Sequence, residues 1–339
     1  MSDIQFLYTV NKKYFSVALA SILSLVANSG LFKDGTGVIH IITEEISAQD
    51  IGLVERIKSI CPNLQIYCYP LENYNIASYN IPDWQNTQIA NSRLFFQDII
   101  GNRIKDAEYL LYLDADTIVT GDLSKIVRAT NLIAAVEDIL PRKYAESLHL
   151  SRYHNSGVLL IDIQKWISEC SQEQLKEYIQ MHSLQDLKYP DQDILNLVFH
   201  DSIFSLPRSY NLQTFAYALE GKPLEQYCNN RNISIKDILD AKENPKILHS
   251  TAFLGIKPWM KNTIHPYSLI FNKYLYQVVP SFDADEVSGW KKLLAKNPFL
   301  FYLLYNINAY IPIDFNSKYC GNFPPLRDKG DMKLQKIKK

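Results

Sequence analysis

The chain has 339 residues, of which 47% are hydrophobic and 12% aromatic, enough to bury the core of one large domain or two average ones. Its formal net charge of −1 argues against a general nucleic-acid binder. Five scattered cysteines without CxxC spacing argue against a disulfide framework or a zinc site. We find no signal-peptide pattern and no apolar run of about 18 residues, so we expect a cytoplasmic protein.

The first third of the chain alternates short apolar runs with longer segments of helical periodicity. Strands are expected at Ile4–Val10, Gly37–Thr43, Leu64–Tyr69 and Tyr109–Leu113, and helices at Tyr14–Asn28, Ser47–Ile60 and about Gln88–Ile100. Alternation of this kind predicts an α/β fold with a parallel sheet covered by helices. In such sheets, ligands bind beyond the carboxyl ends of the strands.

The later part of the chain is less regular. Strands are expected at Ile133–Val136, Val158–Ile161 and Ile247–Leu248, and helices at Gln164–Met181 and Asp191–Val198. Residues Tyr210 to Asn244 are polar and mixed, and we assign no element there. A domain boundary near Pro280–Asp285 would divide the chain into residues 1–280 and 281–339.

Two aspartates follow the buried strand that ends at Leu113. Unpaired charge is costly at such a place, so Asp114 and Asp116 need a partner. Residues i and i+2 of an extended segment point to the same side, and paired carboxylates suit Mg²⁺ or Mn²⁺ bound to substrate phosphates. The alternative is a helix N-cap formed by Asp116 or Thr117. A bare DxD pattern leaves both interpretations open.

Four sequence blocks, taken together, resemble the family 8 glycosyltransferases. They are YLLYLDAD with the following GDL (Tyr109–Leu123), HNSGVLLIDIQKW (His154–Trp166), YPDQDILN (Tyr189–Asn196) and ILHSTAFLGIKPW (Ile247–Trp259). Their order and spacing match the DxD, N-[AS]-G, D-Q-D and His…Lys-Pro-Trp segments of that family. The resemblance covers roughly residues 4 to 275.

The resemblance implies a GT-A fold, a Rossmann-like, mixed and mainly parallel sheet flanked by helices. It implies that Asp114, Asp116 and His249 ligate Mn²⁺, with Mg²⁺ as the alternative, and that the ion bridges the phosphates of a UDP-sugar. Such an ion orients the donor and neutralises charge on the departing UDP. By itself, His249 would read as a core or surface histidine. The family places this His six residues before its Lys, whereas eight separate His249 from Lys257, so this loop is longer.

The D-Q-D block implies the sugar-binding and catalytic positions. Asp191 resembles the residue that holds sugar hydroxyls, and Gln192 the residue beside the anomeric carbon. A carboxylate beside the anomeric carbon would suggest a covalent nucleophile, as in retaining glycosidases, whereas an amide is a poor nucleophile. The resemblance implies retention of configuration, and the sequence leaves both a covalent and a front-face mechanism open. Asn155 resembles a donor-sugar contact. The alternatives are a helix N-terminus that favours Asp191 and an ordinary turn asparagine.

The end of the first strand departs from the family pattern A-x-D-x-N-Y, whose Asp reads uracil and whose Tyr stacks on it. In TVNKKY, Asn11 stands at the Asp position, Lys13 at the Asn position and Tyr14 at the Tyr position. An amide both donates and accepts hydrogen bonds, so uridine remains our expectation. The other nucleotide-sugar-binding positions implied by the resemblance are Thr9, Arg93, Ala115, Gly255 and Lys257. Lys257 would act as a point charge on the diphosphate, and the alternative for Arg93 is a surface-helix arginine.

The C-terminal segment is basic and aromatic. From Trp290 onward there are 10 Lys/Arg against 3 Asp, whereas the first 289 residues carry 25 against 33 acidic residues. The stretch Lys291–Phe315 is too short in apolar residues to span a bilayer and suits an interfacial anchor near anionic lipid. The alternative is a helical tail packed on the domain. We expect a GT-A catalytic domain at 1–280 and peripheral attachment to the inner face of the membrane through 281–339.

The sequence therefore predicts a retaining, Mn²⁺-dependent hexosyltransferase. It would move galactose or glucose from UDP to a glycan or glycolipid acceptor in bacterial lipopolysaccharide, capsule or related cell-surface glycans. One alternative is a non-enzymatic, degenerate sugar-nucleotide-binding scaffold, and another is a self-glycosylating initiator, since 22 tyrosines offer acceptors. A dehalogenase-type phosphatase also uses DxDx[TV], but here Ile118 holds the fifth position and the motif follows three strands.

Overall fold

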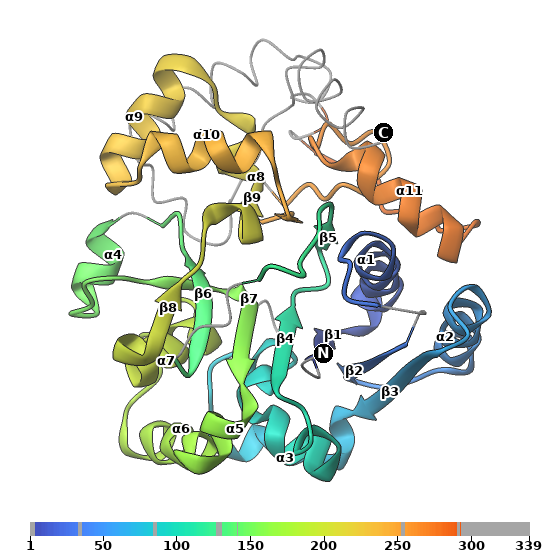
Figure 1. Cartoon of the computed structure of the whole chain (residues 1–339), viewed down its shortest axis with the longest axis horizontal. Coiled ribbons are helices and arrows are strands. Elements are labelled where there is room, and N and C mark those ends of the chain that lie inside the picture. The colour runs from blue at the N-terminus through green and yellow to red at the C-terminus, as the bar shows by residue number, and fades with distance from the viewer. Residues whose placement is uncertain are drawn as a thin grey trace.

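The computed structural model describes residues 4–32, 36–83, 87–126, 131–140, 142–251, 255–289 and 292. Its centre is a seven-stranded sheet in the order β3-β2-β1-β4-β7-β6-β8 (Figure 1). The strands are β1 (Ile4–Val10), β2 (Gly37–Thr43), β3 (Leu64–Pro70), β4 (Tyr109–Leu113), β6 (Ile133–Glu137), β7 (His154–Asp162) and β8 (Ile203–Ser205). Neighbouring strands are parallel except at β7, which is antiparallel to β4 and β6. The mixed, mainly parallel sheet expected from the sequence is confirmed.

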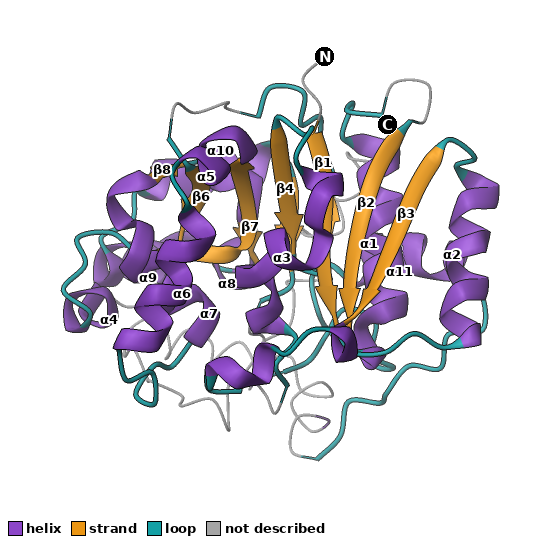
Figure 2. Cartoon of the chain, turned by 90° about the horizontal axis from the view of Figure 1, so that it is seen from below, coloured by secondary structure: helices purple, strands orange, loops and turns teal. Residues whose placement is uncertain are grey.

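Helices cover both faces of this sheet (Figure 2). Side chains alternate along β1, so Phe6 and Tyr8 join one core while Leu7 joins the other. The first core includes α1 (Phe15–Asn28), α2 (Ala48–Ile60) and α11 (Ser268–Val278). The second includes α3 (Phe96–Ile100), α5 (Ile163–Ser168), α6 (Ser171–Met181) and α7 (Pro190–Phe199). Burial on both faces explains why the sheet strands read as continuous apolar runs.

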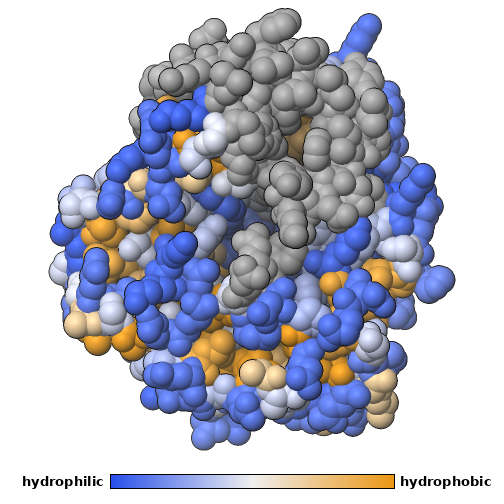
Figure 3. Space-filling view, turned by 180° about the vertical axis from the view of Figure 1, so that it is seen from behind, coloured by the Kyte–Doolittle hydropathy of each residue, from blue (hydrophilic) through white to orange (hydrophobic). Residues whose placement is uncertain are grey.

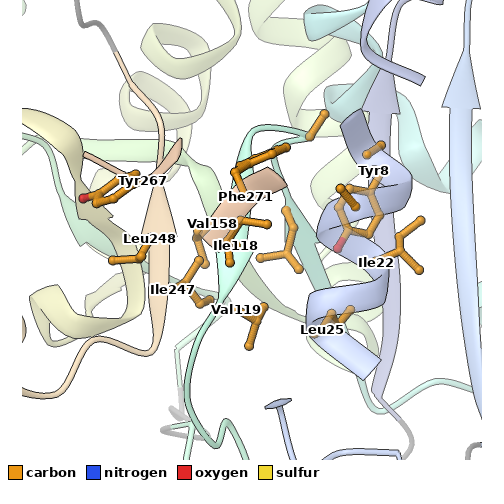
Figure 4. Close-up of a cluster of buried hydrophobic side chains, with 14 of the residues drawn as sticks. Tyr8, Ile22, Leu25, Ile118, Val119, Val158, Ile247, Leu248, Tyr267 and Phe271 are labelled. Carbon is orange, nitrogen blue, oxygen red and sulfur yellow. The ribbon is translucent and has the colours of Figure 1, made fainter. Parts of the chain in front are cut away.

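A small second sheet connects the C-terminal third to the chain that follows β4. It consists of β5 (Thr117–Val119), β10 (Ile247–His249) and β9 (Leu212–Gln213), with β10 in the middle. Apolar side chains of β5 and β10 belong to the same buried cluster as those of α1 and as Tyr267 and Phe271 (Figure 4). Because β5 begins one residue after Asp116, the helix N-cap alternative for the DxD segment is wrong.

The segment Tyr210–Asn244, for which the sequence offers no assignment, is largely helical. The helices α8 (Thr214–Ala218), α9 (Gly221–Arg231) and α10 (Ile235–Glu243) lie there, and α4 (Arg142–Ser147) lies earlier in the chain. The predicted α-helix at Gln88–Ile100 is wrong at its start, where Ala90–Phe95 forms the 3₁₀ helix η5. Ser92 Oγ and Asn91 Nδ2 bind nearby backbone carbonyls, and such side-chain bonds compete with α-helical pairing.

The single helix predicted at Gln164–Met181 is also wrong, because the chain breaks into α5 and α6 at Cys170. That residue adopts a left-handed conformation with φ 54°. A continuous helix would place Glu173, seven residues after the buried Trp166, on the core-facing side. The break instead turns Leu175 and Ile179 inward, where both are buried.

Within the described ranges, no helix is both long enough and apolar enough to span a bilayer. The exposed large hydrophobic residues are spread over several elements and include Ile51, Met181, Phe204, Leu239 and Leu269. On the face shown in Figure 3, hydrophobic areas alternate with hydrophilic ones. The expected basic, aromatic tail falls outside the described residues, because beyond Gly289 only Lys292 is described.

A buried histidine on β2 predicts that acid destabilises the fold. His40 Nε2 is 2.7 Å from Gln5 Oε1, and His40 Nδ1 is 2.9 Å from the Tyr69 hydroxyl. Burial, with a contribution from Arg103, lowers the pKa of His40 from 6.5 to about 4. The unfolded chain therefore binds the proton first, and stability falls as pH drops from about 6.5 to about 4.

At pH 4 this one site accounts for about 3 kcal/mol of lost stability. We expect the difference in unfolding free energy between pH 7 and pH 4, measured with urea, to shrink by about that amount in His40→Gln. His182→Gln, at an exposed position, is the control. An unchanged pH dependence in His40→Gln would contradict the assignment.

Candidate active site

Asp114, Asp116 and His249 meet at the carboxyl end of β4. Pairing of β10 with β5 sets His249 opposite Thr117, next to the two aspartates. His249 Nε2 lies 3.4 Å from Asp114 Oδ2 and 3.2 Å from Asp116 Oδ1. The ligand atoms of all three residues lie within 4.8 Å of one another. Two carboxylates and one imidazole form a donor set that suits Mn²⁺.

Gly157 on β7 provides the room for this cluster. A Cβ atom at this position would lie 2.2 Å from His249 Cε1 and 2.6 Å from Asp114 Oδ2. Real Cβ contacts are essentially never shorter than 3.0 Å. The cluster thus has the donor atoms and the space that a divalent cation requires.

The two oxygens of Asp114 have different roles. Oδ1 accepts hydrogen bonds from Tyr112 at 2.6 Å and forms an ion pair with Arg93 at 3.1 Å, which leaves Oδ2 facing His249. Because the Tyr112 hydroxyl donates to Asp114, it accepts from Thr9, 2.9 Å away. Burial alone would raise the pKa of Asp114, but Arg93 and His249 hold it well below its usual value. Thr9 therefore orients the Tyr112 hydroxyl that donates to Asp114.

Arg93, His249 and Lys257 together offset the negative charge of Asp114 and Asp116. Lys257 Nζ lies 2.5 Å from Asp116 Oδ2 and donates to the Ser250 carbonyl at 2.8 Å. Burial opposes ionisation of Asp116, yet Lys257 and His249 lower its pKa. Although burial lowers the pKa of His249, Asp116 and Asp114 raise it to about 9. A divalent cation would therefore compete with Lys257 for Asp116 Oδ2.

Arg93 joins this cluster to the start of α7. Its Nε lies 3.2 Å from Asp191 Oδ2, and its Nη1 donates to the Ser156 carbonyl at 2.9 Å. The Arg93 side chain is only 8% exposed, so the surface-helix alternative is wrong. Burial raises the pKa of Asp191 despite the opposing charge of Arg93, and the negative charge of Asp114 adds to the rise. Both aspartates thus depend on one buried cation.

Gln192, next to Asp191, is held by three partners. Its Oε1 accepts from the Ser156 amide at 2.9 Å and from Asn155 Nδ2 at 3.0 Å. Its Nε2 donates to Asp138 Oδ2 at 3.1 Å, and Asn155 Nδ2 contacts the same oxygen at 2.8 Å. The side chains of Asn155 and Gln192 therefore have a fixed orientation beside the cluster.

The positions at the end of β1 lie next to the Lys-Pro-Trp segment. Asn11 Oδ1 accepts from the Tyr14 amide at 3.0 Å and caps the 3₁₀ helix η1 (Lys12–Tyr14). Tyr14 contacts Trp259 edge-on, with ring centroids 5.4 Å apart, and Lys13 is exposed. Burial raises the pKa of Tyr14, and the nearby charge of Lys257 opposes that rise. The structure thus brings Tyr14 to the site, with Asn11 at the start of the same helical turn.

Two further implied positions lie along the same segments. Ala115 is buried between the two aspartates in sequence, and Gly255 is exposed with φ 68°, a left-handed conformation that glycine adopts readily. Although the loop before it is two residues longer than in the family, Lys257 still reaches Asp116.

Asp138 and Asn211 belong to the site but were missed in the sequence. Asp138 directly follows β6, so the rule that ligands bind beyond strand ends would have indicated it. Asn211 ends the 3₁₀ helix η8 (Arg208–Asn211) in the unassigned segment and contacts both Asn155 and His249. Asp193 instead accepts from Tyr144 at 2.6 Å and from the Tyr189 amide at 3.0 Å, which stabilises the start of α7.

Comparison with known proteins assigns the family. The model of "Glycosyl transferase family 8" matches residues 5–263. The chain belongs to glycosyl transferase family 8. The dehalogenase-type alternative is therefore wrong, and the family resemblance drawn from the four sequence blocks is confirmed.

Family 8 relatives include General stress protein A of Bacillus subtilis strain 168, which is 28% identical over 200 residues, covering 57% of this chain and 66% of the relative. Lipopolysaccharide 1,2-glucosyltransferase of Escherichia coli K12 is 26% identical over 276 residues, covering 76% of this chain and 73% of the relative. The chain thus spans about two thirds to three quarters of these two curated relatives.

Solved structures of similar fold include the galactosyltransferase LgtC, crystallised with donor and acceptor sugar analogues. Its TM-score is 0.59 at 20% identity, covering 80% of this chain and 95% of LgtC. The bifunctional glycosyltransferase WbbM has a TM-score of 0.62 at 16% identity, covering 87% of this chain and 51% of WbbM. This family 8 chain therefore has the GT-A fold expected from its sequence.

Proposed function

We propose that the chain is a retaining, divalent-metal-dependent hexosyltransferase that moves galactose or glucose from UDP to a glycan or glycolipid acceptor. One observation carries the proposal. The cluster of Asp114, Asp116 and His249 lies at the same edge of the sheet as Asp191 and Gln192, and the buried Arg93 joins the two groups. A degenerate scaffold would not need both groups intact and hydrogen-bonded.

The proposal assigns a task to each part of the site. Asp114, Asp116 and His249 would hold Mn²⁺, which would neutralise charge on the UDP leaving group. Lys257 would leave Asp116 and bind the diphosphate, where its ammonium group would act as a point charge. Residues 11–14 would contact the nucleoside, together with Ala115 and Gly255 beside the phosphates, while Asp191 and Asn155 would bind the hexose hydroxyl groups. Arg93 would hold Asp191 in place and reach the donor sugar.

The surroundings of Gln192 favour one retaining mechanism. Its Oε1 already accepts two hydrogen bonds, from Ser156 and Asn155. An amide oxygen with two donors is a weak nucleophile, which favours front-face transfer over a covalent glycosyl–glutamine intermediate. Gln192 would then stabilise positive charge at the anomeric carbon or position the acceptor.

Release of UDP tests the proposed function. The chain is assayed with a panel of UDP-sugars, with and without Mn²⁺. We expect slow hydrolysis of one UDP-hexose, lost with EDTA and reduced at least about 1,000-fold in Asp114→Ala, because the leaving group loses its electrostatic stabilisation. Asp201→Asn, at an exposed acidic residue, is the control with full activity.

Release that is absent from every donor, together with no detectable binding of UDP to the wild-type chain, would favour the scaffold. A mass increase on the purified chain after incubation with the UDP-sugar would favour the self-glycosylating initiator. Mn²⁺ is the proposed ion, and the same assay with Mg²⁺ compares the two.

The acceptor and the membrane attachment are proposed on separate grounds. Curated relatives named as lipopolysaccharide glycosyltransferases support a cell-surface glycan or glycolipid acceptor. The surplus of lysine and arginine after Trp290 supports contact of residues 281–339 with anionic lipid at the cytoplasmic face of the membrane. We propose residues 1–280 as the catalytic domain, in line with the family match to residues 5–263.

A further inference from the structure

We infer that Asn211 is a positioning residue that fixes which ring nitrogen of His249 faces the aspartates and links that histidine to the sugar-binding amides. The inference rests on the proposed metal site. Asn211 Oδ1 lies 2.9 Å from His249 Nδ1, and Asn211 Nδ2 donates to Asn155 Oδ1 at 2.8 Å. Asn211 is 2% exposed, so water does not replace these contacts.

The direction of this chain of hydrogen bonds is fixed at its far end by groups whose roles cannot change. The backbone amide of Ser156 is a donor, so the Gln192 atom that faces it is the oxygen. Gln192 Nε2 then donates to the Asp138 carboxylate, which accepts. Asn155 Nδ2 lies between Gln192 Oε1 and Asp138 Oδ2, both acceptors, and is therefore the amide nitrogen.

A second backbone donor fixes the other end of Asn155. The Gly157 amide donates to Asn155 Oδ1 at 3.0 Å, so this atom is an acceptor. Asn211 must present its NH₂ group to that oxygen, and its own oxygen then faces His249. That oxygen only accepts, so the proton on His249 stays at Nδ1. Two backbone amides of β7 thus determine the tautomer of a histidine on β10.

This polarity has a direct consequence for metal binding. Nδ1 keeps its proton for Asn211, so a metal ion displaces the proton of the imidazolium from Nε2, and Nε2 is the atom that faces Asp114 and Asp116. Partners that orient a ligand histidine in this way generally change metal affinity 10- to 100-fold when they are removed. Asn211 also ties the position of His249 to that of Asn155 and Gln192.

Two substitutions at the same position separate these effects. Asn211→Leu removes both hydrogen bonds, whereas Asn211→Asp keeps an acceptor for His249 Nδ1 and loses only the donor to Asn155. The readout is the dissociation constant of Mn²⁺ alone, measured from the electron paramagnetic resonance signal of free Mn²⁺ at one fixed pH. We expect an increase of at least about 10-fold in Asn211→Leu and less than about 3-fold in Asn211→Asp.

The matched control is Asn28→Leu. The side chain of Asn28, at the end of α1, hydrogen-bonds to the carbonyls of Ser24 and Val119 and to the Tyr274 hydroxyl, and leucine removes these bonds. It should lower the melting temperature and leave Mn²⁺ affinity unchanged. The inference is overturned if folded Asn211→Leu binds Mn²⁺ like the wild type, or if Asn211→Asp loses affinity as Asn211→Leu does. Should the leucine variant not fold, Asn211→Ala, which also removes both hydrogen bonds, takes its place with the same expected loss of affinity.

Failure of the proposed function looks different. A wild-type chain that does not bind Mn²⁺ removes the metal site, and the inference with it. A wild type that binds Mn²⁺ with an unaffected Asn211→Leu variant leaves the metal site standing and removes only the role of Asn211.

Discussion

Replacing Gly157 by alanine is expected to weaken Mn²⁺ binding at least about 100-fold and to abolish UDP release. The added Cβ would overlap His249 Cε1 at 2.2 Å and Asp114 Oδ2 at 2.6 Å. The backbone cannot yield easily, because the Gly157 carbonyl accepts from the Asp114 amide at 2.8 Å and its amide donates to Asn155. The ring or the carboxylate must move instead, and metal sites tolerate only a few tenths of an ångström.

Gly52→Ala is the matched control for this substitution. Gly52 lies inside α2 with no heavy atom within 4 Å of the added Cβ, so alanine should stabilise the helix by about 0.5–1 kcal/mol and leave Mn²⁺ binding unchanged. The measurement is calorimetric titration of both variants with Mn²⁺. A Gly157→Ala variant that binds Mn²⁺ within about threefold of the wild type would show that the cluster does not hold the ion.

Replacing Arg93 by methionine is expected to lower the unfolding free energy by about 3–5 kcal/mol. The guanidinium is shared between Asp114 at 3.1 Å and Asp191 at 3.2 Å, and it stacks on the Tyr112 ring at 4.5 Å. Methionine fills a similar volume but leaves two carboxylates at a largely buried site without that cation. The measurement is urea unfolding at neutral pH.

The double substitution Arg93→Met with Asp191→Asn tests the cause of this loss. If the uncompensated carboxylate is responsible, the loss caused by Arg93→Met is smaller in the Asp191→Asn background. Additive losses would contradict this explanation. Lys176→Met, which breaks the partly exposed 2.8 Å pair with Asp98, should cost no more than about 1 kcal/mol.

Much of the fold follows from local sequence signals. The bounds of β1, β2 and β4 agree with those predicted, because mainly apolar runs are followed by polar residues. β7 begins at His154 rather than Val158, since His154 and Asn155 are buried strand residues whose polar groups bind other side chains. The 3₁₀ helix η5 arises from the hydrogen bonds of Asn91 and Ser92 to backbone carbonyls. The break at Cys170 arises from the burial of Leu175 and Ile179 in the second core. Composition reveals neither.

The candidate site divides in a similar way. Residues that follow strands or belong to the four sequence blocks could be named in advance, and the structure brings Asp114, Asp116 and His249 together. Asn211 could not, because its importance comes from two partners 38 and 56 residues away in the sequence. Arg93 was identified, but its burial between two aspartates depends on how α7 packs against η5.

The pairing of β10 with β5 sets the order in which this protein can mature. His249 and Lys257 come from the last third of the chain, more than 130 residues after Asp114 and Asp116. Contacts over such separations form late, since a long loop must close before they stabilise anything. During synthesis the two aspartates therefore exist for a time without two of their three cationic partners. A cation that binds only the completed cluster would stabilise the state in which β10 is paired with β5. The supply of metal would then affect folding yield as well as catalysis.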